Sequence, residues 1–365
     1  MKQLKILYGY RSACVKNATG IPVFVKSIFE ELKKNEDIQL RITGCFMEYV
    51  PKRPYLIFRF IPLFYYSLYL PLKLILGKYD FYIENDYFFI PLWKPKRTKV
   101  ITVVYDIGLI LFDNIQTKKI TKSWRWKFIR SMKNSDIIVT ISQSSKKDIQ
   151  DYLHSIGMKD KPIYCMYCDA QLVVPTVDKM EETLKKYSIQ NDYFLFLGTL
   201  EPRKNPLNMI KAFHVFKKSD SKDTKFVFAG GKGWLYDEVL QYIKDHHLED
   251  EVIFTGYVSE EEKYFLLKQA SAFVFLSIYE GFGIPPLEAL KLGTPVLLSD
   301  IPVFKELFED SVWYASENDI KDISYKMNEI MMNTQPKDAA KVIEKFSWEK
   351  SANILMGIIN KEVKQ

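Results

Sequence analysis

Residues 277–297 read SIYEGFGIPPLEALKLGTPVL, with two glutamates, Glu280 and Glu288, on either side of a segment rich in glycine and proline. The apolar residues before Glu280 predict a strand, and the two prolines predict the start of a helix with Glu288 in its first turn. The glycines let the backbone bend between these two elements. A strand that leads through a polar loop into a helix is the repeating unit of a parallel α/β sheet, and ligands bind at the loops that follow such strands.

The rest of the chain repeats this alternation of strand and helix patterns, and the alternation restarts after residue 169. A chain of 365 residues is long enough for two domains of ordinary size. The sequence therefore predicts an α/β protein with two Rossmann-like halves that face a central cleft and are joined by a linker at 169–190. Strands are predicted at 4–10, 40–47, 80–85, 98–106, 136–142, 193–200, 225–231, 252–258, 272–277 and 294–300, and helices at 19–35, 143–153, 205–218, 235–247, 259–269, 285–292 and 302–308.

The net charge of +7 is unevenly distributed. Residues 1–170 contain 28 Lys and Arg but 15 Asp and Glu, a net charge of +13, whereas the remainder carries −6. This asymmetry indicates that the first half faces an anionic partner. In residues 52–78, KRPYLIFRFIPLFYYSLYLPLKLILGK, basic residues are interleaved with a long apolar and aromatic run, which favours a membrane surface over nucleic acid. Arg59, Lys73 and two prolines interrupt the run, so it is predicted to lie at the interface and not to cross the bilayer.

A second segment, KKITKSWRWKFIRSMK at 118–133, supports contact with a membrane surface. Ile120, Trp124, Phe128 and Met132 recur at helical spacing, and basic residues fill much of the remaining surface. The alternative is that these four side chains belong to the protein core and that the lysines are ordinary solvated surface.

The four cysteines, Cys14, Cys45, Cys165 and Cys168, are few and irregularly spaced, which argues against the disulfide framework of a secreted protein. Cys165 and Cys168 form a C-x-x-C motif, but no second pair and no nearby histidine completes a zinc site, so two reduced thiols are the simpler interpretation. The first ten residues contain no long apolar segment typical of a cleavable signal peptide. We therefore expect a cytoplasmic protein, bound peripherally to the inner face of the cell membrane.

A candidate phosphate site lies in LGTLEPRKNPLNMIKAF, residues 197–213. Arg203 and Lys204 stand on a tight turn after a predicted strand, and Asn205 is the expected N-cap of a helix whose first residue is Pro206. Cations beside a helix N-terminus suit a phosphate group, because the charge and the unpaired N–H groups point the same way. The alternative is an ordinary helix start with surface charge.

The loop FAGGKGW at 228–234 follows another predicted strand, and its glycines would let the backbone approach a ligand closely. The loop nearly matches the dinucleotide fingerprint G-x-G-x-x-G, but Tyr236 stands where the third glycine belongs, which argues against a nicotinamide cofactor. Around the opening stretch, carboxylates can bind hydroxyl groups at both ends while backbone N–H groups address an anion between them. A ligand with hydroxyls at both ends and phosphate in the middle is a nucleotide sugar.

Four ordered motifs carry a resemblance to a known family. SDIIVTISQSSKKDI, LGTLEPRKN, FTGYVSEEE and EGFGIPPLEAL together resemble the retaining glycosyltransferases of family 4, which have the GT-B fold. The similarity is strongest over about 190–310 and weaker over 1–168. The resemblance implies two Rossmann-like domains, 1–170 for the acceptor and 171–345 for the nucleotide sugar, with a C-terminal helix at 346–365 that crosses back to the first domain.

The resemblance also implies roles for single residues. Glu280 would match the family's first glutamate, which faces the donor sugar, and Glu288 the second, which binds the ribose hydroxyls. Arg203 and Lys204 would neutralise the diphosphate as the glycosidic bond breaks. The other donor-binding candidates supply backbone groups or a place for the base, and they are Gly20, Gly198, Thr199, Gly231, Val258, Phe282, Gly283 and Ile284.

Tyr105 and Asp106 complete the catalytic candidates, and they would line the acceptor side. Many family members carry a histidine where this chain has Tyr105, so a contact from that histidine to the transferred sugar is replaced or lost. Thr199 stands at a position that is often arginine, which leaves the diphosphate charge to Arg203 and Lys204. If these cations and helix N–H groups stabilise the leaving diphosphate, no metal and no cofactor is required.

The sequence thus predicts a bacterial retaining glycosyltransferase that moves a hexose from a GDP- or UDP-sugar to a sugar acceptor, in the synthesis of capsule, O-antigen or exopolysaccharide. A lipid-diphosphate-linked acceptor would present both an acyl chain and an anion to the basic, aromatic first domain. Two other classes stay open. A non-catalytic membrane-surface protein would have no need of Glu280, Arg203 and Lys204 together, and a GT-B nucleotide-sugar epimerase would act without an acceptor.

Overall fold

The computed structural model describes residues 3–14, 20–45, 64–86, 90–112, 118–177, 179–220, 222–231, 233, 237–333 and 337–364. Parts of several sequence predictions lie outside the described residues. They include positions 52–63 of the aromatic run, the side chain of Ile120, and Lys232, Trp234 and Tyr236 of the glycine loop. They also include residue 19 of the helix predicted at 19–35, residues 46–47 of the strand predicted at 40–47 and residues 235–236 of the helix predicted at 235–247. The chain divides into two compact units, residues 1–169 with 346–365, and residues 170–345. The boundary expected from the sequence is 170/171, with the helix at 346–365 assigned to the first domain.

Within the described residues, the first unit is built on a six-stranded parallel sheet in the order β2-β1-β3-β4-β5-β6. Its strands are β1 (Leu4–Gly9), β2 (Ile38–Thr43), β3 (Phe81–Glu84), β4 (Lys99–Val103), β5 (Ile137–Thr140) and β6 (Ile163–Cys165). Its helices are η1 (Arg11–Cys14), α1 (Ile21–Lys33), η4 (Tyr65–Tyr69), α3 (Leu70–Gly77), α4 (Gly108–Leu111), α5 (Lys118–Asn134), α6 (Gln143–Ser155) and α15 (Trp348–Val363).

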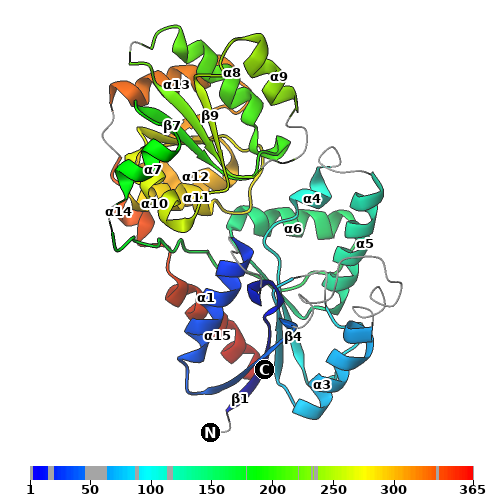
Figure 1. The fold of residues 1–365 in the computed structure, drawn as a ribbon. Coiled ribbons are helices and arrows are strands. Elements are labelled where there is room, and N and C mark those ends of the chain that lie inside the picture. Colours follow the sequence, from blue (N-terminus) through cyan, green and yellow to red (C-terminus); the bar gives the residue numbers. More distant parts are fainter. Residues whose placement is uncertain are drawn as a thin grey trace. The chain divides into compact units, whose positions relative to one another are not determined.

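Helices cover both faces of this sheet, which explains why its strands read as continuous apolar runs. On one face, Leu7 and Tyr82 pack with η4 and α3, and a neighbouring cluster joins β5 and β6 to α5 and α6. On the other face, the Tyr8 hydroxyl donates to the Val25 carbonyl of α1 at 3.0 Å. Helix α15 packs beside α1 (Figure 1), so the C-terminal helix belongs to the first unit.

Helix α5 coincides with the amphipathic segment predicted at 118–133, but two residues of its apolar stripe face the core. Phe128 and Met132 are fully buried in the cluster that includes Ile138 of β5. The interfacial interpretation is therefore wrong for these two residues, and the alternative of core packing holds. Trp126 lies on another face of the helix, is 63% exposed, and has the Arg130 guanidinium 5.5 Å from its ring centroid.

The described end of the aromatic run forms one π-helical turn, η4, that continues into α3. Tyr65, Leu70 and Leu74 are buried against the sheet. A stripe on the opposite side is exposed, and it consists of Phe64, Leu68, Tyr69, Leu72, Ile75 and Leu76. None of the helices in the described part of the chain combines the length and the apolar character needed to span a membrane.

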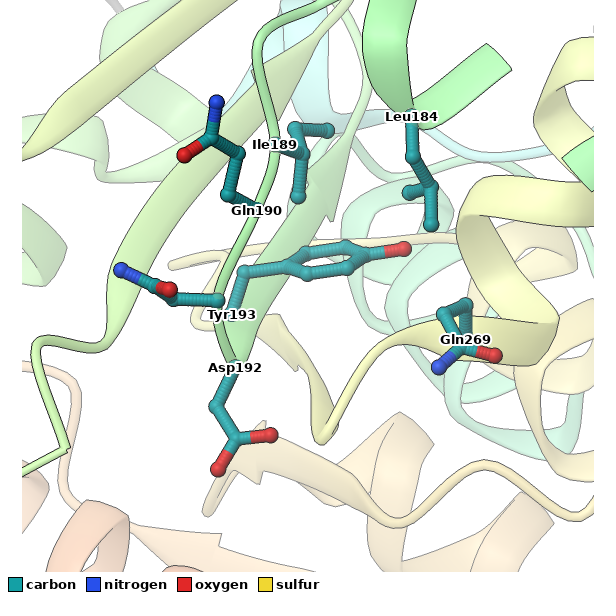
Figure 2. A pocket seen from close by; sticks show the side chains of 7 residues that line it. Leu184, Ile189, Gln190, Asp192, Tyr193 and Gln269 are labelled. Carbon is teal, nitrogen blue, oxygen red and sulfur yellow. The ribbon is translucent and has the colours of Figure 1, made fainter. Parts of the chain in front are cut away.

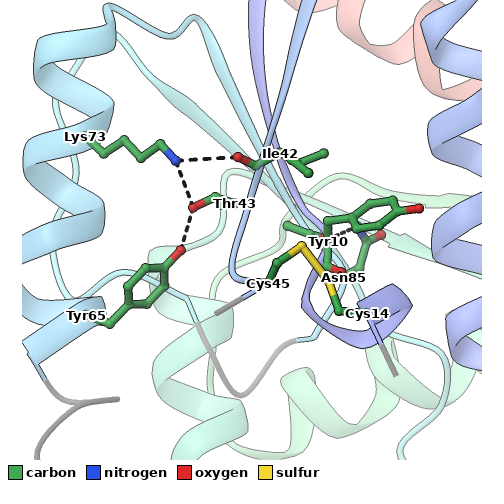
Figure 3. The surroundings of a disulfide bond; sticks show 9 residues. Tyr10, Cys14, Ile42, Thr43, Cys45, Tyr65, Lys73 and Asn85 are labelled. Atoms are coloured by element: carbon green, nitrogen blue, oxygen red, sulfur yellow. Dashed lines mark hydrogen bonds between the residues drawn. A yellow bond between two sulfur atoms is a disulfide. The ribbon is translucent and has the colours of Figure 1, made fainter. Parts of the chain in front are cut away.

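A disulfide joins Cys14, at the end of η1, to Cys45, just after β2 (Figure 3). The two residues are 31 positions apart, and their Cα atoms are 5.8 Å apart. No pattern in the sequence predicts this pair, because the contact depends on the parallel pairing of β1 with β2. Cys165 and Cys168 are thiols, and burial raises the pKa of Cys168 well above its ordinary value.

Glu84 is a buried carboxyl group at the end of β3, with 4% of the residue exposed. Its Oε1 atom accepts a hydrogen bond from the Asp86 backbone N–H at 3.0 Å, and its Oε2 atom is hydrogen-bonded to the Tyr82 hydroxyl. Burial raises the pKa of Glu84 to about 8. The side chain is therefore a neutral carboxylic acid at pH 7.

Replacing Glu84 by glutamine is expected to flatten the pH dependence of the free energy of unfolding. The neutral form stabilises the fold fully below the ordinary glutamate pKa of 4.5, and this contribution is lost as the pH rises through about 8. Relative to the variant, the wild type should lose up to about 1.4 kcal/mol per pH unit in this window. Urea unfolding at a series of pH values measures the difference, and parallel curves for the two proteins would contradict a raised pKa of Glu84.

In the second unit, the described residues form another six-stranded parallel sheet, in the order β12-β11-β10-β7-β8-β9. Its strands are β7 (Tyr193–Leu197), β8 (Lys225–Ala229), β9 (Val252–Gly256), β10 (Ala272–Phe275), β11 (Val296–Ser299) and β12 (Trp313–Ala315). Its helices are α7 (Met180–Lys186), η7 (Pro202–Lys204), α8 (Pro206–Lys217), α9 (Asp237–Asp245), α10 (Glu260–Gln269), α11 (Ile284–Lys291), α12 (Pro302–Phe308), η8 (Glu309–Ser311), α13 (Ile320–Met332) and α14 (Ala340–Ile343).

Adjacent residues of β7 show that helices cover both faces of this sheet as well. The Phe194 ring packs on Phe213 and Phe216 of α8, with centroids 6.3 and 5.1 Å away. The preceding side chain, that of Tyr193, points the opposite way, and its hydroxyl donates to the Leu266 carbonyl of α10 at 2.8 Å. The predicted α/β class with two Rossmann-like sheets is confirmed.

The predicted linker at 169–190 is wrong in its second part, because α7 forms there. Glu181 and Glu182 occupy the first turn of α7 and two lysines the last, which complements the helix dipole. The helix packs on α10, and Lys186 forms an ion pair with Glu262. The few apolar residues of this segment show no clear helical period, so the sequence pattern favoured a linker over a helix.

Candidate functional site

The strand order of the second sheet changes direction between β7 and β10. From β7 the chain proceeds outward through β8 and β9, whereas β10 is added on the other side of β7. In open α/β sheets, ligands bind outside the carboxyl ends of the strands at such a switch point. The loops after these two strands contain Arg203, Lys204 and Glu280, and the structure brings these three predicted catalytic residues together.

Glu280 stands between the two cations. The Lys204 Nζ atom lies 2.5 Å from Glu280 Oε1, and the Arg203 Nη1 atom lies 3.1 Å from Glu280 Oε2. Lys204 also sits over the ring of Phe275, the last residue of β10, 4.6 Å from its centroid. Burial alone would raise the pKa of Glu280, but the two cations outweigh it and the pKa is lowered. Glu280 is therefore a fixed carboxylate at neutral pH.

Hydrogen bonds to backbone carbonyls join the two loops. The Ile278 N–H donates to the Arg203 carbonyl at 2.8 Å, and Arg203 Nη1 donates to the Tyr279 carbonyl at 2.9 Å. Arg203 Nε and Nη2 also donate to Glu201 Oε1 at 3.1 and 2.8 Å. The two cations and the two carboxylates carry no net charge together. An anionic ligand would therefore be bound by hydrogen-bond donors that are held in fixed positions, and not by an excess of positive charge.

The turn that carries the cations differs in one detail from the expected N-cap. Asn205 precedes Pro206 at the start of α8, but its side chain makes no capping hydrogen bond. Asn205 instead adopts the left-handed conformation, with φ of 60°, and its Nδ2 atom donates to the Glu317 carbonyl at 2.7 Å. Asparagine tolerates this conformation, so its role is to turn the chain from η7 into α8.

The glycines near the site mostly serve the packing of the chain on itself. A Cβ atom on Gly230 would lie 2.0 Å from the Gly198 carbonyl oxygen, and one on Gly233 would lie 2.2 Å from the Leu200 carbonyl oxygen. The expected close approach to a ligand is therefore not the reason for glycine at 230 and 233. A Cβ on Gly231 would meet nothing within 4 Å, so this donor-binding candidate borders open space. Thr199, between Gly198 and Leu200, is exposed.

Glu288 lies in the second turn of α11, not in the first, because the helix already begins at Ile284. Gly283 is its N-cap, with φ of 126°, and the two prolines that follow Ile284 have no N–H to offer. The Leu287 N–H donates to the Gly283 carbonyl. In the first turn of α11, the backbone N–H of Ile284 is therefore the donor that remains for a ligand, in place of the several N–H groups expected there. Phe282, the preceding candidate, is buried.

Lys263 of α10 is a site residue that no sequence pattern indicated. Its Nζ atom lies 2.6 Å from Glu288 Oε1 and 2.7 Å from Glu260 Oε2. The Glu288 side chain is 7% exposed, and burial raises its pKa although the ammonium of Lys263 opposes the shift. A lysine inside a predicted helix, 25 residues before its partner, carries no signal of this contact. Val258, the candidate for the base, lies just before α10 and is nearly buried.

Three candidates lie in the first unit. Gly20 is the N-cap of α1 with φ of 69°, and a Cβ there would meet nothing within 4 Å. Tyr105 and Asp106 follow β4. The Tyr105 ring packs edge-on against Phe24 of α1, and its buried hydroxyl has no hydrogen-bond partner in the described part of the chain. Asp106 Oδ1 accepts the Gly108 N–H at 2.9 Å.

A pocket of about 190 Å³ lies at the other end of β7 (Figure 2). It is lined by Leu184, Ile189, Gln190, Asn191, Asp192, Tyr193 and Gln269. Tyr193 begins β7, so this pocket is at the amino end of the strand, whereas Arg203 and Lys204 follow its carboxyl end. The pocket contains none of the candidate residues. Across the described ranges, no three His, Cys, Asp or Glu side chains converge as metal ligands would.

Comparison with known proteins connects this site to a family. Residues 179–346, which contain the ion-paired cluster and the Glu288–Lys263 pair, match the family described as Glycosyl transferases group 1. O-antigen chain mannosyltransferase B of Escherichia coli is 24% identical over 277 residues, which cover 74% of this chain and 71% of that protein. O-antigen chain mannosyltransferase RfbU of Salmonella typhimurium is 32% identical over 225 residues, 62% of this chain and 58% of that protein.

A further relative and a solved structure extend the comparison. UDP-Gal:alpha-D-GlcNAc-diphosphoundecaprenol alpha-1,3-galactosyltransferase of Escherichia coli is 24% identical over 202 residues, and the match spans about half of each chain, 54% and 51%. Sucrose-phosphate synthase from Thermosynechococcus elongatus has the same fold over 99% of both chains, with a TM-score of 0.73 at 14% identity. Residues 179–346 therefore form a domain of the group 1 glycosyl transferases, in a chain whose fold is GT-B.

Proposed function

We propose that the protein is a retaining glycosyltransferase that moves a hexose from a GDP- or UDP-sugar to a sugar acceptor carried on a lipid diphosphate, in the synthesis of a bacterial cell-surface polysaccharide. The observation that carries the proposal is the carboxylate of Glu280 held by Arg203 and Lys204 at the β7/β10 switch point. Family membership supports the reaction class. The names of the O-antigen mannosyltransferases support mannose and O-antigen-like products.

The ion-paired cluster suits the loss of a diphosphate leaving group. Negative charge grows on the diphosphate as the glycosidic bond breaks, and cations that are already fixed stabilise that charge without having to reorganise. Arg203 and Lys204 are held in place by Glu201 and Glu280, and the Glu280 oxygens keep lone pairs that can accept hydrogen bonds from sugar hydroxyls. The site in this proposal needs no metal and no cofactor.

Retention of configuration requires the acceptor hydroxyl to attack from the face that the diphosphate leaves. In the proposed reaction the acceptor oxygen forms the new bond to the anomeric carbon as the bond to the diphosphate oxygen breaks, and the leaving phosphate takes the hydroxyl proton. Tyr105 and Asp106 of the first unit line the acceptor side. Glu288 binds the ribose hydroxyls, with Lys263 fixing its carboxylate.

Replacing Lys263 by methionine is expected to weaken binding of the nucleoside diphosphate about tenfold at pH 7, because the pKa of Glu288 rises further without the neighbouring ammonium. The loss should be larger at pH 6 than at pH 8, since protonated Glu288 accepts fewer hydrogen bonds. Calorimetric titration with the nucleotide measures it. Lys268→Met, at an exposed lysine of the same helix, is the matched control, and equal affinities for both variants would contradict a role for Lys263.

A transfer assay tests the proposed function. The protein is incubated with GDP-mannose, UDP-glucose, UDP-galactose or UDP-N-acetylglucosamine and with acceptor sugars on a short-chain lipid diphosphate. We expect one donor to yield a product whose anomeric carbon keeps the donor configuration by proton NMR. A product of inverted configuration would overturn retention. Release of a free epimer without acceptor would favour the epimerase, and binding to membranes without any turnover would favour the non-catalytic protein.

Contact with a membrane is proposed through the exposed stripe of η4 and α3. Leu92 and Trp93 extend it, because the Leu92 N–H donates to the Tyr66 carbonyl of η4 at 3.0 Å. The exposed basic residues Lys96 and Arg97 follow within four positions. Apolar side chains beside cations suit a bilayer with anionic headgroups.

Co-sedimentation with vesicles of anionic phospholipid tests the membrane contact. We expect the wild type to pellet with the vesicles at low salt and to be released as ionic strength rises. A variant with Leu72→Glu and Leu76→Glu should remain in solution. A wild type that stays in the supernatant at low salt would contradict the proposal.

A further inference from the structure

The first sheet has a switch point of its own. Its order, β2-β1-β3-β4-β5-β6, places β2 on one side of β1 and β3 on the other, so the chain reverses direction between β1 and β3. This is the same topological feature that gathers Glu280, Arg203 and Lys204 in the second unit, and ligands of open α/β sheets bind there. Arg11 lies two residues after the end of β1, and Asn85 and Asp86 directly follow β3.

The polar groups at this point are fixed by hydrogen bonds that join the two strands. Asn85 Nδ2 donates to the Gly9 carbonyl of β1 at 2.8 Å (Figure 3). Glu84 Oε1 accepts the Asp86 N–H, and the Glu84 carboxyl lies so close to β1 that a Cβ on Gly9 would be 2.9 Å from it. Glu84 therefore determines where the backbone of Asp86 lies.

One buried polar atom at this point has no partner. Asn85 is 2% exposed, and its Oδ1 atom makes no hydrogen bond with any residue of the described chain. A buried acceptor without a partner costs stability, so such groups are rare and call for an explanation. A bound hydroxyl group would supply the missing donor.

The charges favour a neutral polyol over an anion. Arg11 Nη1 lies 3.8 Å from Asp86 Oδ2, and the two side chains are 27% and 32% exposed, so both reach the surface of the unit. Burial keeps Glu84 protonated at neutral pH, so it adds no charge. A phosphate would meet the Asp86 carboxylate as well as the guanidinium. Adjacent sugar hydroxyls can donate to the carboxylate and accept from the guanidinium at the same time.

We propose that the β1/β3 switch point binds the sugar residue that accepts the transferred hexose. Asp86 and Arg11 hold two of its hydroxyl groups, and Asn85 Oδ1 accepts a hydrogen bond from a third. Glu84 is a positioning residue that acts through the Asp86 backbone. The inference rests on the proposed glycosyl transfer for the identity of its ligand, and it adds a residue set in the first unit to Tyr105 and Asp106.

Binding of simple glycosides tests the site directly. The full-length protein is mixed with the methyl α- and β-glycosides of mannose, glucose, galactose and N-acetylglucosamine, and saturation-transfer NMR measures binding. We expect at least one glycoside to bind the wild type and Asp86→Asn to weaken it at least tenfold. The matched control is Asp151→Asn, at an exposed aspartate of α6 in the same unit, which should bind as the wild type does. GDP and UDP binding should be equal in all three proteins.

Each outcome separates the two proposals. If a nucleotide binds but no glycoside does, or if Asp86→Asn binds glycosides as well as Asp151→Asn, the acceptor site is overturned while the proposed transfer stands. If neither nucleotide nor glycoside binds, the proposed function fails with it. Binding of glycosides without any nucleotide would support a sugar site in a protein that is not a transferase.

The pH dependence of the same binding tests the role of Glu84. The groups that face it are Tyr8 and Arg11 from β1 and η1, Tyr65 and Tyr66 from η4, Tyr82 and Asp86 from β3 and its loop, and Tyr105. Burial raises the pKa of each of these tyrosines, so they stay neutral at pH 8. Ionised Glu84 would repel Asp86, so glycoside affinity of the wild type should fall above pH 8. Glu84→Gln should bind glycosides with no such fall, and an equal fall in both proteins would remove Glu84 from the proposal.

Discussion

Replacing Lys204 by methionine is expected to lower kcat/KM for sugar transfer at least a hundredfold, the loss found when one fixed donor to a developing negative charge is removed. Lys204 lies 2.5 Å from Glu280 and over the ring of Phe275. The neighbouring Arg203 guanidinium is already held by Glu201 and the Tyr279 carbonyl, and it keeps its own position when Lys204 is removed. The nucleotide should still bind within about tenfold of the wild type, because the effect is largest when the charge on the leaving group grows. Initial rates at varied donor concentration, together with calorimetry, separate the two effects.

Two further variants distinguish a loss of catalysis in Lys204→Met from a loss of folding. Lys204→Met removes one of the two cations that are paired with the buried Glu280 carboxylate, which costs stability. Combining it with Glu280→Gln removes both charges and should recover thermal stability without recovering activity. Lys326→Met, in the surface pair with Glu329, is the matched control and should change neither property. Transfer by Lys204→Met at a rate within threefold of the control would contradict the role of Lys204.

Replacing Gly230 by alanine is expected to destabilise the second unit by about 3 kcal/mol or more. Its φ of 147° is unfavourable for any residue with a Cβ atom, and that atom would lie 2.0 Å from the Gly198 carbonyl oxygen. Because Gly198 is backbone, the clash can be relieved only by separating β8 from β7, just before the loop that carries Arg203. Urea unfolding followed by tryptophan fluorescence and circular dichroism measures the change.

The adjacent glycine provides the control for this prediction. A Cβ on Gly231 would meet nothing within 4 Å, so Gly231→Ala should change the free energy of unfolding by roughly 0.5 kcal/mol or less. Similar stabilities for Gly230→Ala and Gly231→Ala would contradict the close approach of β7 and β8. Any loss of nucleotide binding in Gly231→Ala without a loss of stability would instead support its place among the donor-binding residues.

The sequence predicted the central strands well, because they are buried on both faces and so read as uninterrupted apolar runs bounded by polar loops. The cluster of Glu280 with Arg203 and Lys204 could also be foreseen. All three follow strands, and the carboxyl ends of parallel strands meet at one edge of a sheet. Helix α12 was predicted with the bounds that it has, since Pro302 fixes its start.

Other features depend on contacts that a sequence does not display. The strands β6 and β12 have three residues each, too few to establish a period of two. The apolar stripe of α5 was visible, but periodicity cannot tell whether Phe128 and Met132 meet lipid or the rest of the core. The Glu288–Lys263 pair and the Cys14–Cys45 disulfide join residues that are 25 and 31 positions apart in the chain. These residues come close together only when the strands have paired into a sheet, so the sequence alone does not predict the contacts.

Calorimetric titration of the wild type and of Glu288→Ala with GDP and UDP tests the central claim most directly, because it requires no acceptor. We expect micromolar affinity of the wild type for one of the two nucleotides, weakened about tenfold or more when the buried carboxylate is removed. No binding of either nucleotide, or binding that is unchanged in Glu288→Ala, would contradict a nucleotide-sugar site in the second unit.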